Sequence, residues 1–149
     1  MSAPGILGIS HVALSADDLD AAERFWTEVM GFETTTRLPD LLFVVHREAR
    51  IGLGVTRHAG RVTGPFDPTR TGLDHLALAV ADAPTLERWR ERLDQHGVPH
   101  GEVVDESGLH LNLTAPGGIA LELYVMDAET AAAFGVAGGD EAVARGHGG

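Results

Sequence analysis

Apolar residues in the first third of the chain follow two different periods. Alternation over residues 6–15 predicts a strand, and apolar positions at helical spacing from Leu19 to Met30 predict an amphipathic helix of about three turns. Asp17 and Asp18 precede this helix as candidate N-caps, and Gly31 ends it. β-rich stretches at 33–38, 41–46 and 50–57 follow, separated by polar turns, so the predicted order is strand, helix and three strands.

The same order of patterns starts again after residues 58–71, a segment punctuated by glycine and proline that we interpret as a linker. A strand is predicted at 73–81, then a helix that Asp82 and Pro84 open and Gly97 follows, and strands at 100–106, 109–114 and 119–125. At an offset of 64 residues identities recur in the same order, pairing His11 with His75, Ala13 with Ala77, Leu14 with Leu78, Asp18 with Asp82, Glu23 with Glu87 and Arg24 with Arg88.

This recurrence predicts an α+β fold of two βαβββ modules in one domain, residues 1–126, with module one at 6–57 and module two at 72–126. Residues 127–149 are rich in alanine and glycine and form a C-terminal tail outside that domain. We expect a short helix around 128–134 and a mobile end over about the last dozen residues.

Composition and charge restrict the partners. The chain has 149 residues, a formal net charge of −11 and no cysteine. Nucleic acid and anionic membranes are bound mainly through clustered Lys and Arg, so neither is an expected partner. The lack of cysteine excludes disulfides, thiolate nucleophiles and cysteine-based metal sites. No apolar run approaches the ~20 residues that span a bilayer, and residues 1–8 lack the features of a signal peptide, so we expect a cytoplasmic protein.

Three side chains of ligand type are predicted in the middle of strands, each on the face opposite an aliphatic set. His11 shares its face with Ala13, His75 with Ala77 and Ala79, and Glu122 with Ala120 and Tyr124. The small neighbouring side chains leave room for a ligand, and Gly52 and Gly54 on a nearby strand could enlarge that room. Because a lone buried carboxylate is costly, Glu122 needs a proton, a partner or a metal. Two neutral histidines and one carboxylate form a good donor set for a divalent metal with open positions.

The chain resembles the vicinal oxygen chelate superfamily, the glyoxalase, bleomycin-resistance and extradiol-dioxygenase group, over about residues 6–126. The residues that carry the resemblance are ISHVAL at 9–14, DDLD at 17–20, FW at 25–26, GF at 31–32, LDHLALAV at 73–80 and APGGIALELY at 115–124. It implies that paired βαβββ modules form a half-open cup around one metal. Carried over by position, the metal ligands are His11, His75 and Glu122.

Departures from the family narrow the expected reaction. Glyoxalase I relatives use a fourth ligand, a glutamate, on the last strand of the first module. The corresponding position falls within residues 54–58, where His58 is the only residue of ligand type. Isomerisation of a lactoylglutathione is therefore disfavoured. The remaining three-ligand site favours a small substrate with adjacent oxygens and lyase or isomerase chemistry, with His58 or His110 as proton carrier.

Two alternatives stay open. Extradiol dioxygenase relatives carry a histidine and a tyrosine at the positions where this chain has Val103 and Asn112. His110 could supply the missing acid–base function. His100 lies near the position of Val103 but does not occupy it. A metal-free relative of the bleomycin-binding branch would sequester a natural product, with Phe43 and Phe66 as the freest aromatic candidates.

The favoured interpretation is an enzyme that binds one divalent ion (Fe, Mn, Zn, Ni or Co) and a small molecule. Relatives of this kind are often homodimers, so we expect a homodimer. Whether His11 joins His75 and Glu122 of its own chain or of a neighbour stays open.

Overall fold

The computed structural model describes residues 3–136, which divide into two compact units. One unit contains the chain up to Phe66 together with Ala115–Ile119, and the other contains Asp67–Thr114 and the chain from Ala120 onward. The two are described separately, because their positions relative to one another are not determined. The mobile end predicted for the C-terminal tail lies outside the described residues.

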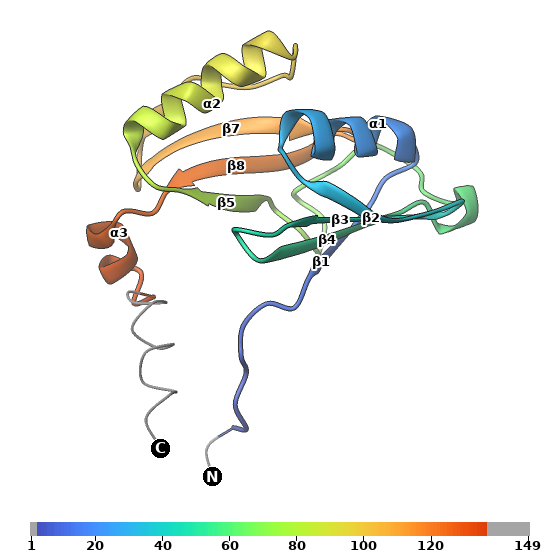
Figure 1. Cartoon of the computed structure of the whole chain (residues 1–149), viewed down its shortest axis with the longest axis horizontal. Helices are drawn as coiled ribbons and strands as arrows, with labels where there is room; N and C mark the ends of the chain where they lie inside the picture. Colours follow the sequence, from blue (N-terminus) through green and yellow to red (C-terminus); the bar gives the residue numbers. More distant parts are fainter. Residues whose placement is uncertain (1–2, 137–149) are drawn as a thin grey trace. The chain divides into compact units, whose positions relative to one another are not determined.

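In the first unit, β1 (Val12–Ser15), α1 (Leu19–Arg24), β2 (Glu33–Leu38), β3 (Leu41–His46) and β4 (Ile51–Thr56) form the predicted βαβββ order (Figure 1). The sheet order is β1-β4-β3-β2, with β1 parallel to β4 and the other pairs antiparallel. Helix α1 continues into a π-helical turn, η1 (Phe25–Val29), and a 3₁₀ turn, η2 (His58–Gly60), follows β4. The predicted helix is confirmed, with a π-helical last turn.

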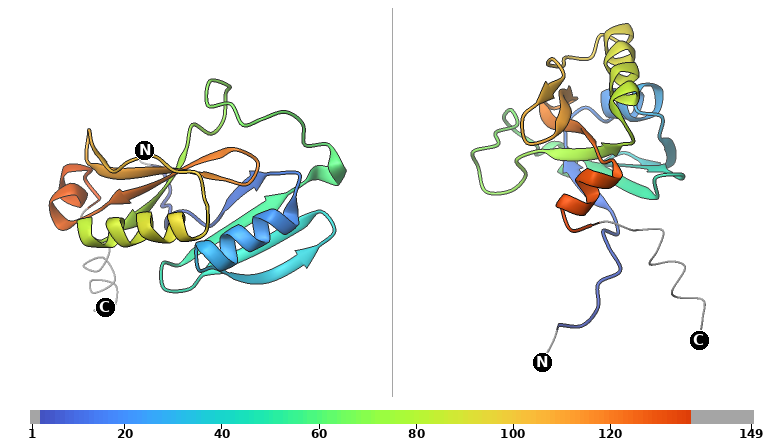
Figure 2. Two further views of the ribbon diagram at one scale, coloured as in Figure 1. Left: turned by 90° about the horizontal axis from the view of Figure 1, so that it is seen from above. Right: turned by 90° about the vertical axis from the view of Figure 1, so that its left-hand side faces the viewer.

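The second unit repeats this order with β5 (Leu76–Val80), α2 (Ala83–Gln95), β6 (Val104–Asp105), β7 (Leu109–Ala115) and β8 (Ile119–Val125). Its sheet order is β5-β8-β7-β6, with β5 parallel to β8. A short helix, α3 (Ala128–Ala133), follows at the place predicted for it. Figure 1 and the right-hand view of Figure 2 place α2 and α3 on opposite sides of this sheet. The α+β fold class is therefore confirmed.

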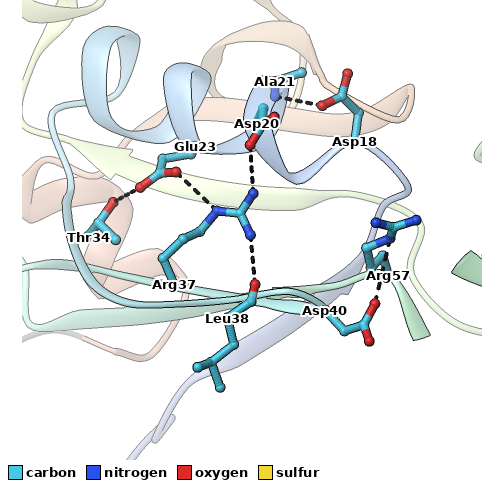
Figure 3. A network of polar contacts seen from close by, with 9 residues as sticks. All are labelled: Asp18, Asp20, Ala21, Glu23, Thr34, Arg37, Leu38, Asp40 and Arg57. Atoms are coloured by element: carbon cyan, nitrogen blue, oxygen red, sulfur yellow. Dashed lines mark hydrogen bonds and ion pairs between the residues drawn. The ribbon is translucent and has the colours of Figure 1, made fainter. Parts of the chain in front are cut away.

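Each α-helix begins at an aspartate whose carboxylate accepts a backbone N–H of the first turn, which otherwise has no partner. Asp18 accepts from Ala21 at 2.9 Å (Figure 3), Asp82 from Thr85 at 2.8 Å and Asp127 from Thr130 at 2.8 Å. The hydrogen bonds from the side chain and backbone of Thr85 lower the pKa of Asp82. Among residues 3–136, no helix combines the length and the apolar character that crossing a membrane requires.

The cores follow the predicted alternation. In β8 the aliphatic residues Leu121, Leu123 and Val125 are buried, while Glu122 and Tyr124 on the other face are partly exposed. Phe25 and Trp26 of η1 are buried, whereas Trp89 of α2 is half-buried.

The first strand of each module is shorter than predicted. The parallel register places Val12 opposite Leu53, and because β4 starts at Ile51, residues before Ser10 have no partner strand; Ile6, Leu7 and Ile9 are exposed. In the second unit β5 starts only at Leu76, which lies opposite Leu121 of β8. His11 and His75 therefore lie directly before β1 and β5, not in the middle of a strand as predicted, whereas Glu122 is in the middle of β8.

Candidate functional site

A pocket of about 570 Å³ opens in the second unit, a size typical of small-molecule sites. Its wall consists of residues from β5, β7, β8, α3 and the connecting turns: His75, Ala77, Leu78, Ala79, Glu106, Ser107, His110, Glu122, Tyr124, Met126 and Phe134. Ala77, Ala79, Glu122 and Tyr124 belong to the faces that alternation predicted to be open. The pocket thus contains His75, Glu122 and His110 of the predicted site residues.

His75 and Glu122 face each other in this pocket. Nε2 of His75 is 3.9 Å from a carboxylate oxygen of Glu122, too long for a hydrogen bond. The Glu122 side chain is 14% exposed and makes no hydrogen bond and no other ion pair within residues 3–136. A carboxylate with so little access to solvent and no direct hydrogen bond is a candidate to bind a cation.

Asp74 orients the His75 ring. Its carboxylate is 2.6 Å from Nδ1 of His75. Because a carboxylate oxygen accepts, Nδ1 carries the hydrogen, and a neutral ring then has its lone pair on Nε2, the atom nearest Glu122. A carboxylate on the far nitrogen is also what fixes the tautomer of most metal-binding histidines.

His110 lies at the start of β7 in the same pocket. Its Nδ1 donates to the Gly108 carbonyl at 2.8 Å, so the neutral ring keeps a basic Nε2. The ring is nearly parallel to that of Tyr124, with an interplanar angle of 8° and centroids 6.0 Å apart. The Tyr124 hydroxyl donates to the carbonyl of Ser107. The turn between β6 and β7 is thus bonded to both rings, which sets the orientation of His110.

His11 belongs to the first unit. Its Nδ1 is 2.9 Å from the hydroxyl of Ser10, the residue before it, just as His75 is bonded by Asp74. Each of the two repeat-related histidines therefore has Nδ1 bonded by its preceding neighbour and Nε2 available. The His11 ring also meets the edge of Phe43, with centroids 6.0 Å apart.

Phe43 fills the room that Gly52 and Gly54 were expected to provide. A Cβ atom at Gly52 would lie 3.0 Å from the Phe43 ring, and one at Gly54 would lie 3.5 Å from it. The two glycines on β4 therefore accommodate an aromatic ring of the neighbouring strand β3 and leave no open space of their own.

The sheet registers identify the repeat counterpart of Glu122. In the second unit Glu122 lies opposite Ala77, and in the first unit Gly54 lies opposite Ala13, the counterpart of Ala77. The position that carries a fourth ligand in glyoxalase I relatives thus holds glycine. His58 lies further along in η2, exposed, with Nε2 3.1 Å from the Ser15 hydroxyl, so within residues 54–58 it is not the register counterpart of Glu122.

His100 is held away from the pocket. Its two ring nitrogens lie 2.7 Å from the Gly101 carbonyl and 2.9 Å from the Asp94 carboxylate. These hydrogen bonds, the one to Gly101 first, raise the pKa of His100. With an acceptor at each ring nitrogen, His100 has a structural role, and it is not among the residues that line the pocket.

Several pocket residues were not predicted as site residues. Glu106, Ser107, Met126 and Phe134 come from turns and from α3, where no strand alternation assigns a face. Tyr124 was placed on the correct face by alternation, but its hydrogen bond to Ser107 depends on the conformation of a distant turn. Among residues 3–136, no group of three or more His, Asp or Glu side chains is arranged to hold a metal ion; His75 and Glu122 form a pair in one unit, and His11 lies in the other.

A family model described as the Glyoxalase/Bleomycin resistance protein/Dioxygenase superfamily matches residues 8–123. No curated protein sequence matches the chain. Among solved structures, the glyoxylase/bleomycin resistance protein/dioxygenase domain from Frankia sp. EAN1pec is 29% identical, with a TM-score of 0.73 over 81% of this chain and 93% of that one.

Two further structures share the fold at lower identity. Lactoylglutathione lyase from Agrobacterium tumefaciens is 24% identical, with a TM-score of 0.67 over 82% of this chain and 96% of that one. The fosfomycin resistance protein FosX from Mesorhizobium loti is 17% identical, with a TM-score of 0.62 over 82% and 94% of the two chains. Because the family model spans most of the chain, this protein belongs to the Glyoxalase/Bleomycin resistance protein/Dioxygenase superfamily.

Proposed function

We propose that this protein is a divalent-metal-dependent enzyme that acts on a small substrate with two adjacent oxygens, as a lyase or isomerase. The observation that carries the proposal is the His75–Glu122 pair: an oriented imidazole nitrogen 3.9 Å from a largely buried carboxylate that has no hydrogen bond of its own within residues 3–136. The proposed metal ligands are His75, Glu122 and His11.

The donor chemistry fits a divalent cation. Two imidazoles and one carboxylate suit Fe, Mn, Zn, Ni or Co, and the neutral tautomer that Asp74 favours in His75, with a lone pair on Nε2, is the form a metal requires. In both histidines the preceding residue, Asp74 or Ser10, occupies Nδ1. A metal bound there would supply Lewis-acid polarisation of the substrate oxygens and leave open positions for them.

The side chains around the pair supply the remaining chemistry. We propose His110 as the proton carrier, because its Nε2 is basic in the neutral ring and its orientation is fixed by the Gly108 carbonyl. His58 stays a second candidate proton carrier, although its Nε2 is bonded to Ser15.

The glycine at the repeat counterpart of Glu122 argues against glyoxalase I chemistry. A fourth carboxylate ligand is missing where that reaction uses one, because Gly54 has no side chain and Phe43 covers it. An extradiol-type dioxygenase is the second candidate function, favoured by the presence of His110 in the pocket with His75 and Glu122.

We propose that the chain forms a homodimer, and the third ligand, His11, can then come from the same copy or from its partner. Mixing His11→Gln protein with Glu122→Gln protein distinguishes these arrangements. If ligands are shared between copies, the mixture regains metal binding at about a quarter to a half of the sites; if each site is built from one chain, it regains none.

Metal analysis after purification without chelators tests the proposal. We expect about one equivalent of Fe, Mn, Zn, Ni or Co per chain, and loss of that metal in Glu122→Gln. His58→Gln serves as the matched control, since the register excludes His58 from the counterpart position. Full metal retention by Glu122→Gln would contradict the ligand assignment, and a chain that neither holds nor takes up metal would favour a metal-free binding protein. Oxygen uptake with a panel of catechols would favour the dioxygenase over the lyase or isomerase.

A further inference from the structure

The pocket of the second unit has a polar and an apolar end, and the strand register gives their order. Along the parallel strands β5 and β8, His75 comes first, then Ala77 beside Glu122, then Ala79 beside Tyr124, and Met126 follows the end of β8. With about 3.3 Å per strand residue, Tyr124 lies roughly 7 Å and Met126 roughly 13 Å beyond Glu122. The stretch from Glu122 past Tyr124 to Met126 is therefore long enough for a ring-sized group attached to a chelating head at Glu122.

Small and apolar side chains line that interval. Ala77 and Ala79 leave the surface of β5 flat, and the rings of Tyr124 and Phe134 lie 5.6 Å apart with a tilt of 42°. Phe134 comes from α3 and is 59% exposed, an unusual position for a large aromatic side chain at the edge of a pocket. A flat apolar group would cover these rings and remove them from water.

The side chains in the wall disfavour a strongly anionic substrate body beyond the chelating head. The only carboxylates in the wall are those of Glu122 and Glu106, and none of its residues is an arginine. The sequence contains no lysine, so every cationic side chain other than histidine is an arginine. In the second unit Arg70 pairs with Asp67 and Arg90 with Glu87 and Asp94, away from the pocket. Phosphate, phosphonate and multiply carboxylated groups are normally bound by such cations.

We propose that the substrate combines a bidentate oxygen head with an uncharged, ring-sized apolar body that rests against Tyr124, Met126 and Phe134, and that Phe134 determines this specificity. The inference rests on the proposed metal site for the head group, and it adds the chemical class of the rest of the molecule.

Three hydroxamates with one chelating head test the inference by calorimetry on protein loaded with Zn²⁺. Acetohydroxamate carries a methyl group, benzohydroxamate a phenyl ring, and 4-carboxybenzohydroxamate the same ring with a negative charge. We expect benzohydroxamate to bind at least about tenfold more tightly than acetohydroxamate, and the carboxylated compound to bind at least about fivefold more weakly than benzohydroxamate. Phe134→Ala should reduce the preference for the phenyl ring about fivefold or more.

Phe66→Ala is the matched control, because Phe66 lines a separate pocket in the first unit and no wall of this one. Its preference for the phenyl ring should equal that of the unaltered protein. Equal affinity for the methyl and phenyl compounds, tighter binding of the carboxylated one, or an unchanged preference in Phe134→Ala would overturn the inference while leaving the metal site intact. Failure to retain Zn²⁺ or bind any hydroxamate would overturn the proposed function, and this inference with it.

Discussion

The histidines of this chain differ in which ring nitrogens are bonded, and this difference separates candidate chemistry from structure. His75 and His110 each donate Nδ1–H to an oxygen that can only accept, which leaves Nε2 basic in the neutral ring. His100 has acceptors at both nitrogens, so its hydrogen bonds favour the doubly protonated ring. The sequence assigns these histidines different expected roles, but only the structure shows which nitrogen of each ring is bonded.

The raised pKa of His100 predicts a pH dependence of stability. A group whose pKa is higher in the folded than in the unfolded state stabilises the fold fully below its unfolded pKa, and this stabilisation is lost as pH rises through the folded pKa. The free energy of unfolding should therefore fall, as pH rises above the ordinary histidine pKa of about 6.5, by more in the unaltered protein than in His100→Gln. Urea unfolding at several pH values measures it.

Asp94→Asn provides the second arm of that test, because it removes the carboxylate partner while keeping His100. It should also flatten the pH dependence. If both variants kept the slope of the unaltered protein, the ion pair of His100 and Asp94 would have no part in it.

Position 108 requires glycine for two reasons, its backbone conformation and the close approach of Tyr124. It has a φ of +112°, and a Cβ atom there would collide with the hydroxyl group of Tyr124. Gly64 has a φ of +78° with open space around it, so Gly64→Ala measures backbone strain alone. We expect Gly64→Ala to lower the free energy of unfolding by about 1 kcal/mol and Gly108→Ala by about 2–3 kcal/mol. Equal losses would mean that the turn moves freely away from Tyr124.

At the scale of elements, alternation and caps predict most of the fold because they report local physics. The strands at 33–38, 41–46 and 119–125 have the predicted bounds, and aspartate caps begin the helices where expected. The strands at 6–15 and 100–106 were predicted too long. Hydrogen bonding to a neighbouring strand determines how far a strand extends. Of the stretch predicted at 100–106, only Val104–Asp105 forms β6, and His100 makes an isolated bridge to Leu113.

Arg37 connects α1 to β2 through a network that charge patterning does not reveal. Its guanidinium donates to Asp20 at 2.6 Å, to Glu23 at 3.2 Å and to the Leu38 carbonyl at 2.7 Å (Figure 3). The hydrogen bond to Asp20 is the largest cause of the raised pKa of Arg37. An arginine held by two carboxylates and a carbonyl is fixed in one geometry, which exposed ion pairs rarely achieve.

Arg37→Ala should lower the free energy of unfolding by about 1–2 kcal/mol, because it leaves three acceptors without their donor. The Arg37 side chain is 33% exposed, whereas that of Arg47, which pairs with Glu33 alone, is 74% exposed. Arg47→Ala, the matched control, should cost at most about 0.5 kcal/mol. Urea unfolding of both variants measures the difference, and equal costs would contradict a structural role for the network around Arg37.

For the whole molecule, the internal repeat is the most informative feature of the sequence. Both units have the same sheet order, and in both a histidine directly precedes the first strand. Face alternation placed His75 and Glu122 on strand faces with room for a ligand, since a period of two assigns each residue of a strand to one face. The resemblance to the superfamily, and not alternation, grouped these two residues and suggested His110 as a proton carrier. Alternation could not predict Phe134, which reaches the pocket from a helix beyond the repeat, nor that Phe43 fills the space above Gly52 and Gly54.

The central claim is that two imidazoles and one carboxylate from the two repeats bind one metal ion. Titration of the apoprotein with Co²⁺, followed by the visible absorption of the bound ion, tests it most directly. We predict saturation at one equivalent, with binding weakened at least about tenfold in each of His11→Gln, His75→Gln and Glu122→Gln and unchanged in His58→Gln. Unaltered Co²⁺ spectra and affinities in the three ligand variants would contradict the account.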